Sequence, residues 1–247
     1  MKYCIVIPTY NNGGTLQEVI ERALAVCPNV IVVNDGSTDS TSDILADIKG
    51  IEVVTYAQNR GKGYALCRGF ERARQLGFTH VVTIDSDLQH FPEDIPLLVE
   101  EASRIHEKGR RGLLMVGARS LKADNMPRGN TFANRFSNFW FALQTLCRMP
   151  DTQSGFRLYS LDSLPPLSLI SNRYEAELAL LVMSAWRGVK LTSVPVRVDY
   201  PADRVSHFRP IADFLRISVL NTFLCLLALL YGYPSMLFYC LKRKLKS

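Results

Sequence analysis

Apolar runs alternate with segments of helical periodicity through the first 90 residues of the chain. Four short runs rich in Val and Ile cover residues 2–8, 30–33, 51–56 and 80–84. The segments between them repeat apolar residues at helical spacing, as at Leu16, Val19, Ile20, Ala23 and Leu24. Because continuous apolar strands between helices are typical of a parallel sheet covered on both faces, this half predicts an α/β fold.

The second half of the chain continues this order less regularly. Helical periodicity predicts helices over about 93–107, 131–148 and 172–187, and apolar runs predict strands over 113–117 and 189–198. A short strand is expected after the polar turn at 150–157. We therefore predict one α/β domain over residues 1–208, with a mostly parallel sheet flanked by helices.

A long uncharged segment follows this domain. No charged residue occurs from Val219 to Leu241, a stretch of 23 residues that is long enough to span a bilayer. Four cations follow within the last six residues, at Lys242, Arg243, Lys244 and Lys246. We interpret residues 209–247 as a membrane-associated segment whose basic tail binds an anionic membrane surface.

Polar clusters follow three of the predicted strands, at residues 8–12, 34–39 and 85–89. In a parallel sheet these carboxyl ends meet at one edge, where ligands bind. The third cluster contains Asp85, Asp87 and Gln89, whose oxygen atoms suit Mg²⁺ or Mn²⁺ when phosphate oxygens complete the coordination. The alternative is that these acids only cap the helix that begins near Pro92.

Cationic groups near the same edge favour a phosphate-bearing ligand. Lys62 lies between Gly61 and Gly63 at the start of a predicted helix, where backbone N–H groups and the helix dipole attract anions. Arg119 follows the strand at 113–117, and its guanidinium suits bidentate binding of phosphate. The alternatives are a tight glycine turn with a solvated lysine, and a surface arginine.

Composition narrows the classes of function. The chain has 247 residues and a net charge of +6, but four of its cations lie in the tail. The charge therefore forms no smooth basic stripe, which argues against a nucleic-acid partner. The six cysteines form no C-x-x-C pair and no Cys/His cluster with zinc spacing, so no structural zinc site is expected.

Six motifs occur in the order found in one family of enzymes. They are VIPTYNN (6–12), VVNDGSTDST (32–41), NRGKGYALCRGF (59–70), IDSDLQHFPED (84–94), GAR (117–119) and DTQSGFRLYS (151–160). Together they resemble family-2 glycosyltransferases of the GT-A fold, most of all polyprenyl-phosphate sugar transferases of the dolichyl-phosphate mannose synthase type. The resemblance covers roughly residues 3–210. It implies a Rossmann-like sheet and transfer of a sugar, with inversion, from a UDP or GDP donor to a lipid phosphate.

The resemblance also implies roles for individual residues. The donor would lie against Pro8, Tyr10, Asp35, Gly61, Lys62, Gly63 and Asp85, with Asp35 near the base or ribose. Asp87 and Gln89 would bind the metal. The catalytic charges would come from Asp85, Asp87, Arg119 and Arg135, with both arginines facing phosphate. The acceptor would lie near Gln153, Ser154, Gly155, Arg204 and Arg209.

Two acids keep a second class of acceptor open. In relatives that glycosylate hydroxyls, an acid near Glu175 and Glu177 is the general base, because an alcohol must lose its proton and an ionised phosphate need not. The alternative is that Glu175 and Glu177 form an exposed helix face with no catalytic role.

Two further positions leave parts of the site open. Asn34 stands where the family often has an acid, which leaves the identity of the donor open. His90 is expected either at the metal or leaving phosphate, or on the surface.

Nucleotide sugars are made in the cytoplasm, so the resemblance implies a site at the cytoplasmic face of the membrane. A single crossing would carry the basic tail to the other side, against the positive-inside tendency. Gly232 and Pro234 also interrupt the apolar run. We therefore predict a helical hairpin or re-entrant pair over about 211–231 and 235–244, embedded from one side. The alternative is a helix pair that packs on the α/β domain or on a partner.

Overall fold

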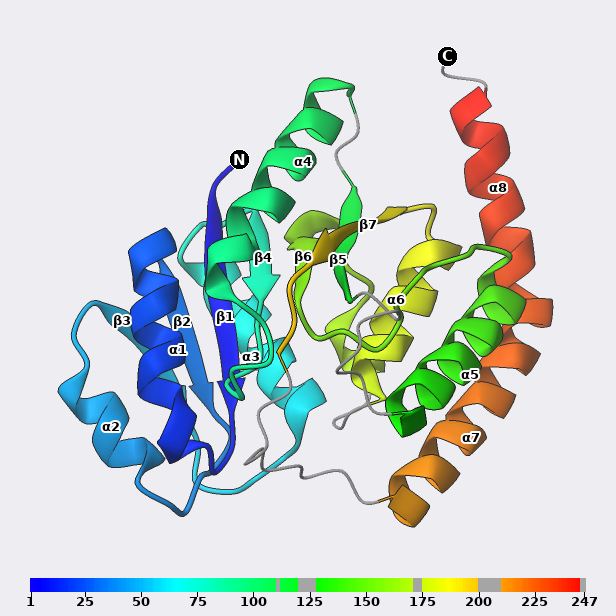
Figure 1. Cartoon of the computed structure of the whole chain (residues 1–247). Helices are drawn as coiled ribbons and strands as arrows, with labels where there is room; N and C mark the ends of the chain where they lie inside the picture. Colours follow the sequence, from blue (N-terminus) through cyan, green and yellow to red (C-terminus); the bar gives the residue numbers. More distant parts are fainter. Residues whose placement is uncertain (110–111, 120–127, 171–174, 200–209, 245–247) are drawn as a thin grey trace.

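The computed structural model describes residues 1–109, 112–119, 128–170, 175–199 and 210–244. Seven strands form one sheet in the order β3-β2-β1-β4-β6-β5-β7 (Figure 1). They are β1 (Tyr3–Thr9), β2 (Val30–Asn34), β3 (Ile51–Thr55), β4 (His80–Thr83), β5 (Leu113–Arg119), β6 (Arg157–Ser160) and β7 (Lys190–Val196). β6 runs antiparallel to β4 and β5, and the other neighbouring strands pair in parallel. The predicted mostly parallel sheet is confirmed.

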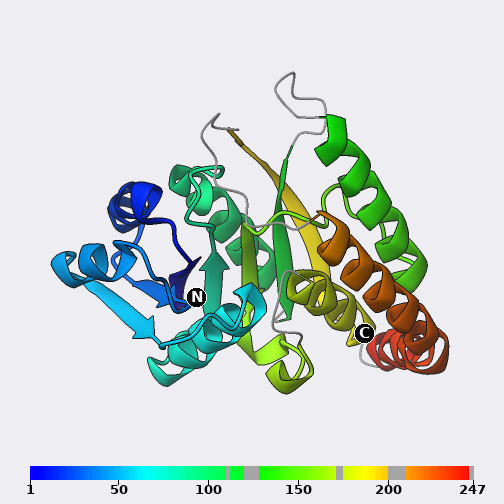
Figure 2. The same ribbon diagram turned by 90° about the horizontal axis from the view of Figure 1, so that it is seen from below.

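Helices cover both faces of this sheet (Figure 2). α1 (Gly13–Val26) and α4 (Ile95–Glu107) pack on one face, and α3 (Lys62–Gln75) and α6 (Ala176–Trp186) pack on the other. α2 (Thr41–Asp47) lies beside α1, and α5 (Arg128–Thr145) packs on α6. Short 3₁₀ turns are η1 (Pro92–Asp94), η2 (Leu161–Ser163) and η3 (Leu167–Leu169).

Alternate residues of the strands supply two separate cores. In β1, Cys4 and Val6 belong to the core beneath α3 and α6, whereas Ile5 and Ile7 belong to the core beneath α1 and α4. Side chains of a strand point alternately to its two faces, so a strand with both faces covered must be apolar throughout. This double burial explains why the strands appear in the sequence as continuous apolar runs.

The predicted elements exist, and their ends differ by a few residues. The helix expected over 131–148 covers Arg128–Thr145, and the helix expected over 93–107 begins as the 3₁₀ turn η1 before α4. The strand expected over 189–198 is the shorter β7. β7 contains Pro195 and lies at the edge of the sheet, where a residue without an N–H is tolerated.

The C-terminal segment is one continuous helix, so the predicted hairpin is wrong. α7 (Pro210–Leu227) continues through a π-helical turn, η4 (Ala228–Gly232), into α8 (Tyr233–Lys244). Pro234 has no N–H to donate, and in a regular α-helix its ring would clash with the carbonyl four residues earlier. The wider π-helical turn accommodates the proline without reversing the chain.

A buried histidine lies at the amino edge of the sheet. His80 is 7% exposed, and its Nε2 lies 2.8 Å from His106 Nε2 and 3.0 Å from Ser160 Oγ. Burial, helped by the nearby His106, lowers the pKa of His80 from 6.5 to about 4. The folded protein therefore keeps this imidazole neutral at a pH where the unfolded chain binds a proton.

We expect the free energy of unfolding to fall as the pH drops from 6.5 to about 4, because only the unfolded chain binds a proton at His80 in this range. The side chain in the variant His80→Gln stays neutral in both states. Over the same pH interval, the free energy of unfolding of this variant should therefore fall by on the order of 2 kcal/mol less than that of the wild type. Urea unfolding of both proteins at several pH values measures the difference. Equal pH dependence in the two proteins would contradict the assignment.

Candidate active site

Side-chain hydrogen bonds tie together the loops at the carboxyl edge of the sheet. The amide of Asn12 donates to Ser86 Oγ at 2.8 Å, and the backbone N–H of Asn11 donates to Ser37 Oγ at 3.0 Å. These bonds join the loops that follow β1, β2 and β4. The prediction that the three polar clusters share one edge is therefore confirmed.

Asp35 fixes the loop that precedes α3. Its buried carboxylate accepts hydrogen bonds from the backbone N–H groups of Arg60 at 2.7 Å and Gly61 at 2.8 Å, and from the amide of Asn59 at 3.0 Å. Gly61 has a φ of 98°, a left-handed conformation that favours glycine. Asp35 thereby sets the position at which α3 begins, and its contact with a nucleoside stays a prediction.

Lys62 joins two acids from distant parts of the chain. Its Nζ lies 2.7 Å from Asp85 Oδ1 and 3.1 Å from Glu177 Oε2. Lys62 opens α3, Asp85 follows β4, and Glu177 lies in the first turn of α6. The ammonium therefore connects the donor residues predicted at the edge of the sheet with one of the two predicted bases.

Burial and pairing act in opposite directions on this cluster. Burial lowers the pKa of Lys62, but Asp85 and Glu177 raise it by more, so the pKa lies above the ordinary range for lysine. Burial raises the pKa of Asp85, but the Lys62 ammonium, together with weaker contributions from neighbouring groups such as Arg157, lowers it below its ordinary value. Lys62 and Asp85 are consequently both charged at neutral pH.

Gly155 leaves just enough space for this ion pair. A Cβ atom at this position would lie 2.5 Å from Asp85 Oδ2 and 2.8 Å from Lys62 Nζ. Both distances are shorter than a van der Waals contact, so any side chain at Gly155 would have to displace the pair. The segment at 151–155, predicted to be on the acceptor side, thus packs directly against two donor-side residues.

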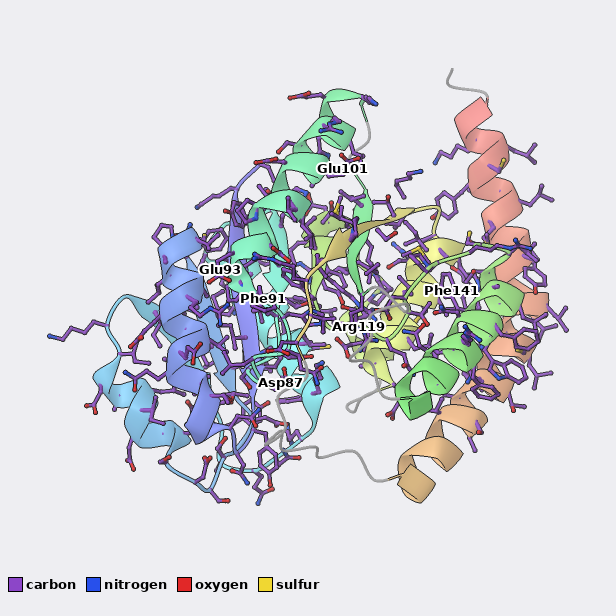
Figure 3. The ribbon with its side chains drawn as sticks, viewed as in Figure 1. Asp87, Phe91, Glu93, Glu101, Arg119 and Phe141 are labelled. Carbon is purple, nitrogen blue, oxygen red and sulfur yellow. The ribbon has the colours of Figure 1, made fainter. Side chains whose placement is uncertain are left out.

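Asp87 and Gln89 follow Asp85 in the loop after β4. Leu88 has a φ of 59°, which is unusual for a branched residue and turns the chain so that the Gln89 N–H donates to Asp87 Oδ1 at 3.1 Å. Figure 3 shows Asp87 at the carboxyl edge of the sheet. Carboxylate and amide oxygens fit Mg²⁺ or Mn²⁺ by their chemistry. The described residues hold no group of three His, Cys, Asp or Glu that could bind a metal, so phosphate oxygens would have to complete the coordination.

Arg119, predicted to face phosphate, forms a bidentate pair with Asp151. Its Nε and Nη2 donate to the two carboxylate oxygens at 2.7 and 3.0 Å. Asp151 is fully buried and also accepts a hydrogen bond from Asn134 Nδ2 of α5 at 2.6 Å. Burial raises the pKa of Asp151, but the Arg119 guanidinium and the backbone N–H groups that donate to the carboxylate together lower it below its ordinary value. The pair fixes the start of the 151–155 segment against β5 and α5.

Arg157 is a buried arginine that sequence analysis did not identify. Its side chain is fully buried and donates to the carbonyl oxygens of Ser154 at 2.6 Å, Thr152 at 2.9 Å and Glu177 at 2.6 Å. It thereby joins the 151–155 segment to the first turn of α6. The signal for Arg157 is its place between Phe156 and Leu158 at the start of the strand expected after 150–157, because a charged residue between buried apolar neighbours needs partners.

The remaining predicted residues are more scattered. Pro8, Gly63 and Ser154 are buried, Tyr10 and Glu175 are partly exposed, and Gln153 and Arg135 are exposed. Arg204 and Arg209 lie outside the described residues. His90, for which both a metal contact and a surface position were open, is buried with its Nε2 3.4 Å from Ser154 Oγ. Burial lowers the pKa of His90 to about 4, so this imidazole is neutral.

Fold and site together define an enzyme-like α/β protein with a charged site at the carboxyl edge of a parallel sheet. Residues 4–163 match the model of glycosyl transferase family 2. This match covers more than half of the chain, and the chain therefore belongs to glycosyl transferase family 2. The resemblance inferred from the six motifs is confirmed.

Several known proteins are similar to this chain. It is 26% identical over 215 residues to the UDP-N-acetylglucosamine–dolichyl-phosphate N-acetylglucosaminyltransferase of Methanococcus voltae, covering 79% of this chain and 85% of that one. It is 40% identical over 110 residues to the undecaprenyl-phosphate 4-deoxy-4-formamido-L-arabinose transferase of Pseudomonas fluorescens, covering 40% and 31%. The crystal structure of mannosyl-3-phosphoglycerate synthase from Rubrobacter xylanophilus superposes with a TM-score of 0.63 at 19% identity, covering 90% and 72%. This last similarity supports the GT-A fold alone.

The variant Gly155→Ala should separate Lys62 from Asp85 while leaving the fold intact, because its methyl group would overlap both side chains. Displacements of this size at a reacting centre cost on the order of 100-fold in rate. Sugar transfer and thermal unfolding measure the two effects. Gly14→Ala is the matched control, since no atom lies within 4 Å of the added methyl group. Equal activity of both variants would contradict the described packing.

Proposed function

We propose that this family-2 glycosyltransferase moves a sugar from a nucleotide-diphosphate donor to a polyprenyl phosphate. The observation that carries the proposal is the ion pair between Lys62 and Glu177. Glu177 lies where a relative that glycosylates hydroxyls would have its general base, and here its carboxylate neutralises the partly buried Lys62 ammonium. A phosphate acceptor is already ionised and needs no base, so catalysis then reduces to positioning and charge stabilisation.

The donor binds at the carboxyl edge of the sheet. The backbone N–H groups at the start of α3 and the Lys62 ammonium attract its diphosphate. Asp87 and Gln89 would hold Mg²⁺ or Mn²⁺, and a metal ion bound there would neutralise the charge that develops on the leaving nucleotide diphosphate. Asp85 keeps Lys62 directed toward the donor. The relative from Methanococcus voltae is named for a UDP sugar, and both UDP and GDP suit the charges of this site.

The acceptor phosphate approaches the sugar from the side opposite the nucleotide. Such a displacement inverts the configuration at the anomeric carbon. Gln153, Ser154 and Gly155 line the acceptor side, Arg119 positions them through Asp151, and Arg135, Arg204 and Arg209 supply positive charge. Both curated relatives compared above are named for lipid-phosphate acceptors, which supports the same class of acceptor here.

Transfer to a hydroxyl of a lipid or glycan is the second candidate. Glu177 Oε1 is buried and has no hydrogen-bond partner among the residues that the structure describes. An unpaired carboxylate oxygen could accept the proton of an alcohol, which favours this alternative. Glu175 precedes α6, is partly exposed, and is the other possible base.

We place the enzyme at the cytoplasmic face of a membrane through its C-terminal segment. A helix of 26 residues, Ile217–Lys242, is apolar and long enough to cross a bilayer, and only 17% of its most apolar part is buried. The hydrocarbon chain of a polyprenyl phosphate stays in the bilayer, so the enzyme must work where membrane and cytoplasm meet.

Purified protein should release UDP or GDP from one sugar donor only when a polyprenyl phosphate and Mg²⁺ or Mn²⁺ are present. The variant Asp87→Ala should lower this rate by about 100-fold or more, because it removes a charged metal ligand. A chelator should also weaken nucleotide binding in calorimetry, independently of turnover. Metal-independent binding and transfer would contradict the assigned role of Asp87.

Two glutamine variants separate the acceptor classes. Glu177→Gln should keep transfer to a polyprenyl phosphate within about tenfold of the wild type, whereas loss of a general base costs about 10²–10⁴-fold. Glu175→Gln tests the other possible base at the same helix end. Product formation from phosphate and hydroxyl acceptors is measured for each. Wild-type transfer to a hydroxyl acceptor that falls about 10²-fold or more in Glu177→Gln would support the hydroxyl mechanism instead.

A further inference from the structure

The C-terminal helix exposes a continuous apolar surface. Its outward residues include Leu230, at 80% exposure, together with Val219, Phe223, Leu226, Leu229, Tyr231, Leu237, Phe238 and Leu241. These positions recur through α7, η4 and α8, so the surface extends along most of the helix. Soluble monomers rarely leave contiguous apolar patches of this extent uncovered.

α5 extends this surface on a second element. Phe139, Leu143 and Leu146 are exposed by 62%, 46% and 73%, and their spacing puts them on one side of the helix and its end. α5 contacts both α7 and η4, and the hydroxyl of Tyr233 donates to the carbonyl of Leu143. We call the exposed apolar residues of α5, α7, η4 and α8 the docking face.

The C-terminal helix is fixed to the domain on its opposite side. Asn221 and Leu224 are buried, and Gln144 Nε2 of α5 donates to Asn221 Oδ1 at 2.9 Å. Further along, a Cβ atom at Gly232 would lie 2.5 Å from the indole of Trp186, which shows how closely the helix approaches α6. A buried amide pair and a glycine contact of this kind specify one register between helices.

The end of the helix also lies against the domain. Tyr239 of α8 packs against Gly188, and it lines a cavity together with the charged residues Asp162 and Arg187. Figure 1 shows the helix passing along the side of the domain, from the carboxyl edge of the sheet beyond its amino edge. If this helix crossed a bilayer, the charged residues beside Tyr239 and the adjoining sheet would enter the hydrocarbon, at a cost of several kcal/mol for each charge.

Charge at the docking face suits an anionic lipid surface. The described parts of these elements, residues 133–150 and 217–242, contain Arg135, Arg148 and Lys242 but no Asp or Glu. Lys242 lies over the ring of Phe238, 5.9 Å from its centroid, at the end of the apolar surface. Cations at the border of an apolar helical face are typical of helices that lie in the membrane interface.

We propose that the docking face lies in the plane of an anionic membrane, with α5 and the C-terminal helix side by side in one leaflet, and that the helix does not cross the bilayer. The proposal rests on the proposed function for the lipid-phosphate acceptor that makes a membrane necessary. It adds α5 to the binding surface and keeps both ends of the C-terminal helix on the side of the active site.

Vesicle binding by the full-length chain tests the role of α5. The double variant Phe139→Glu/Leu143→Glu, and the single variant Leu146→Glu, should each bind vesicles of equal parts phosphatidylcholine and phosphatidylglycerol at least about tenfold more weakly. Leu76→Glu and Leu97→Glu place the same charge at exposed apolar positions directly after α3 and on α4, and they should bind like the wild type. Circular dichroism verifies the fold of each variant. Unchanged binding of the folded α5 variants would overturn the proposal.

A C-terminal tag on protein bound to sealed vesicles tests the orientation of the helix. The tag should remain fully accessible to protease from outside, on the same side as the catalytic domain. Protection of the tag would show that the helix crosses the bilayer and would overturn the proposal.

A second copy of the chain is the competing occupant of the docking face. Self-association in sedimentation without lipid, lost in the α5 variants while vesicle binding is unchanged, would identify that occupant and overturn the proposal. These experiments use no donor or acceptor, so a failed transferase assay leaves their outcome unaffected.

Discussion

The ion pairs of Lys62 hold the site together. One partly buried ammonium lies within 3.1 Å of acids from two other elements, so α3, the loop after β4 and α6 share one centre of charge. The Glu177 carboxylate is nearly buried, and such a group without its cation is strongly unfavourable, so the positions of α3 and α6 depend on each other. Gly155 permits this approach because any side chain there would overlap Asp85 and Lys62. The position of the 151–155 segment and the geometry of the ion pair therefore depend on each other.

Around this centre, buried cationic groups organise the polypeptide as well as carrying charge. Arg119 orders the 151–155 segment through Asp151, and Arg157 joins the same segment to α6 through three carbonyl oxygens. Such hydrogen bonds fix positions before a ligand arrives, which is the form of preorganisation that charge stabilisation in a transition state needs. A family-2 glycosyltransferase can therefore dispense with a mobile base, provided that its acceptor arrives ionised.

Local patterns were sufficient to predict the sheet and the edge where its polar loops meet, because residues that are close in the sequence determine where strands end and helices begin. They could not pair Lys62 with Glu177, since this contact depends on how α3 and α6 pack on the same face. The hairpin prediction failed for a similar reason. Gly232 and Pro234 indicate a break in an isolated helix, but Trp186 packs against Gly232 and the helix continues through a π-helical turn. Arg157 was overlooked because its partners are carbonyl oxygens, which no sequence motif marks.

Removing the Lys62 ammonium tests this account most directly. Calorimetric titration of the folded variant Lys62→Met with UDP and GDP, in the presence of Mn²⁺, compares its nucleotide affinity with that of the wild type. Two uncompensated carboxylates beside a diphosphate should weaken binding at least about tenfold, a difference of about 1.4 kcal/mol. Nucleotide affinity that is unchanged or stronger in the variant would contradict the central role of Lys62.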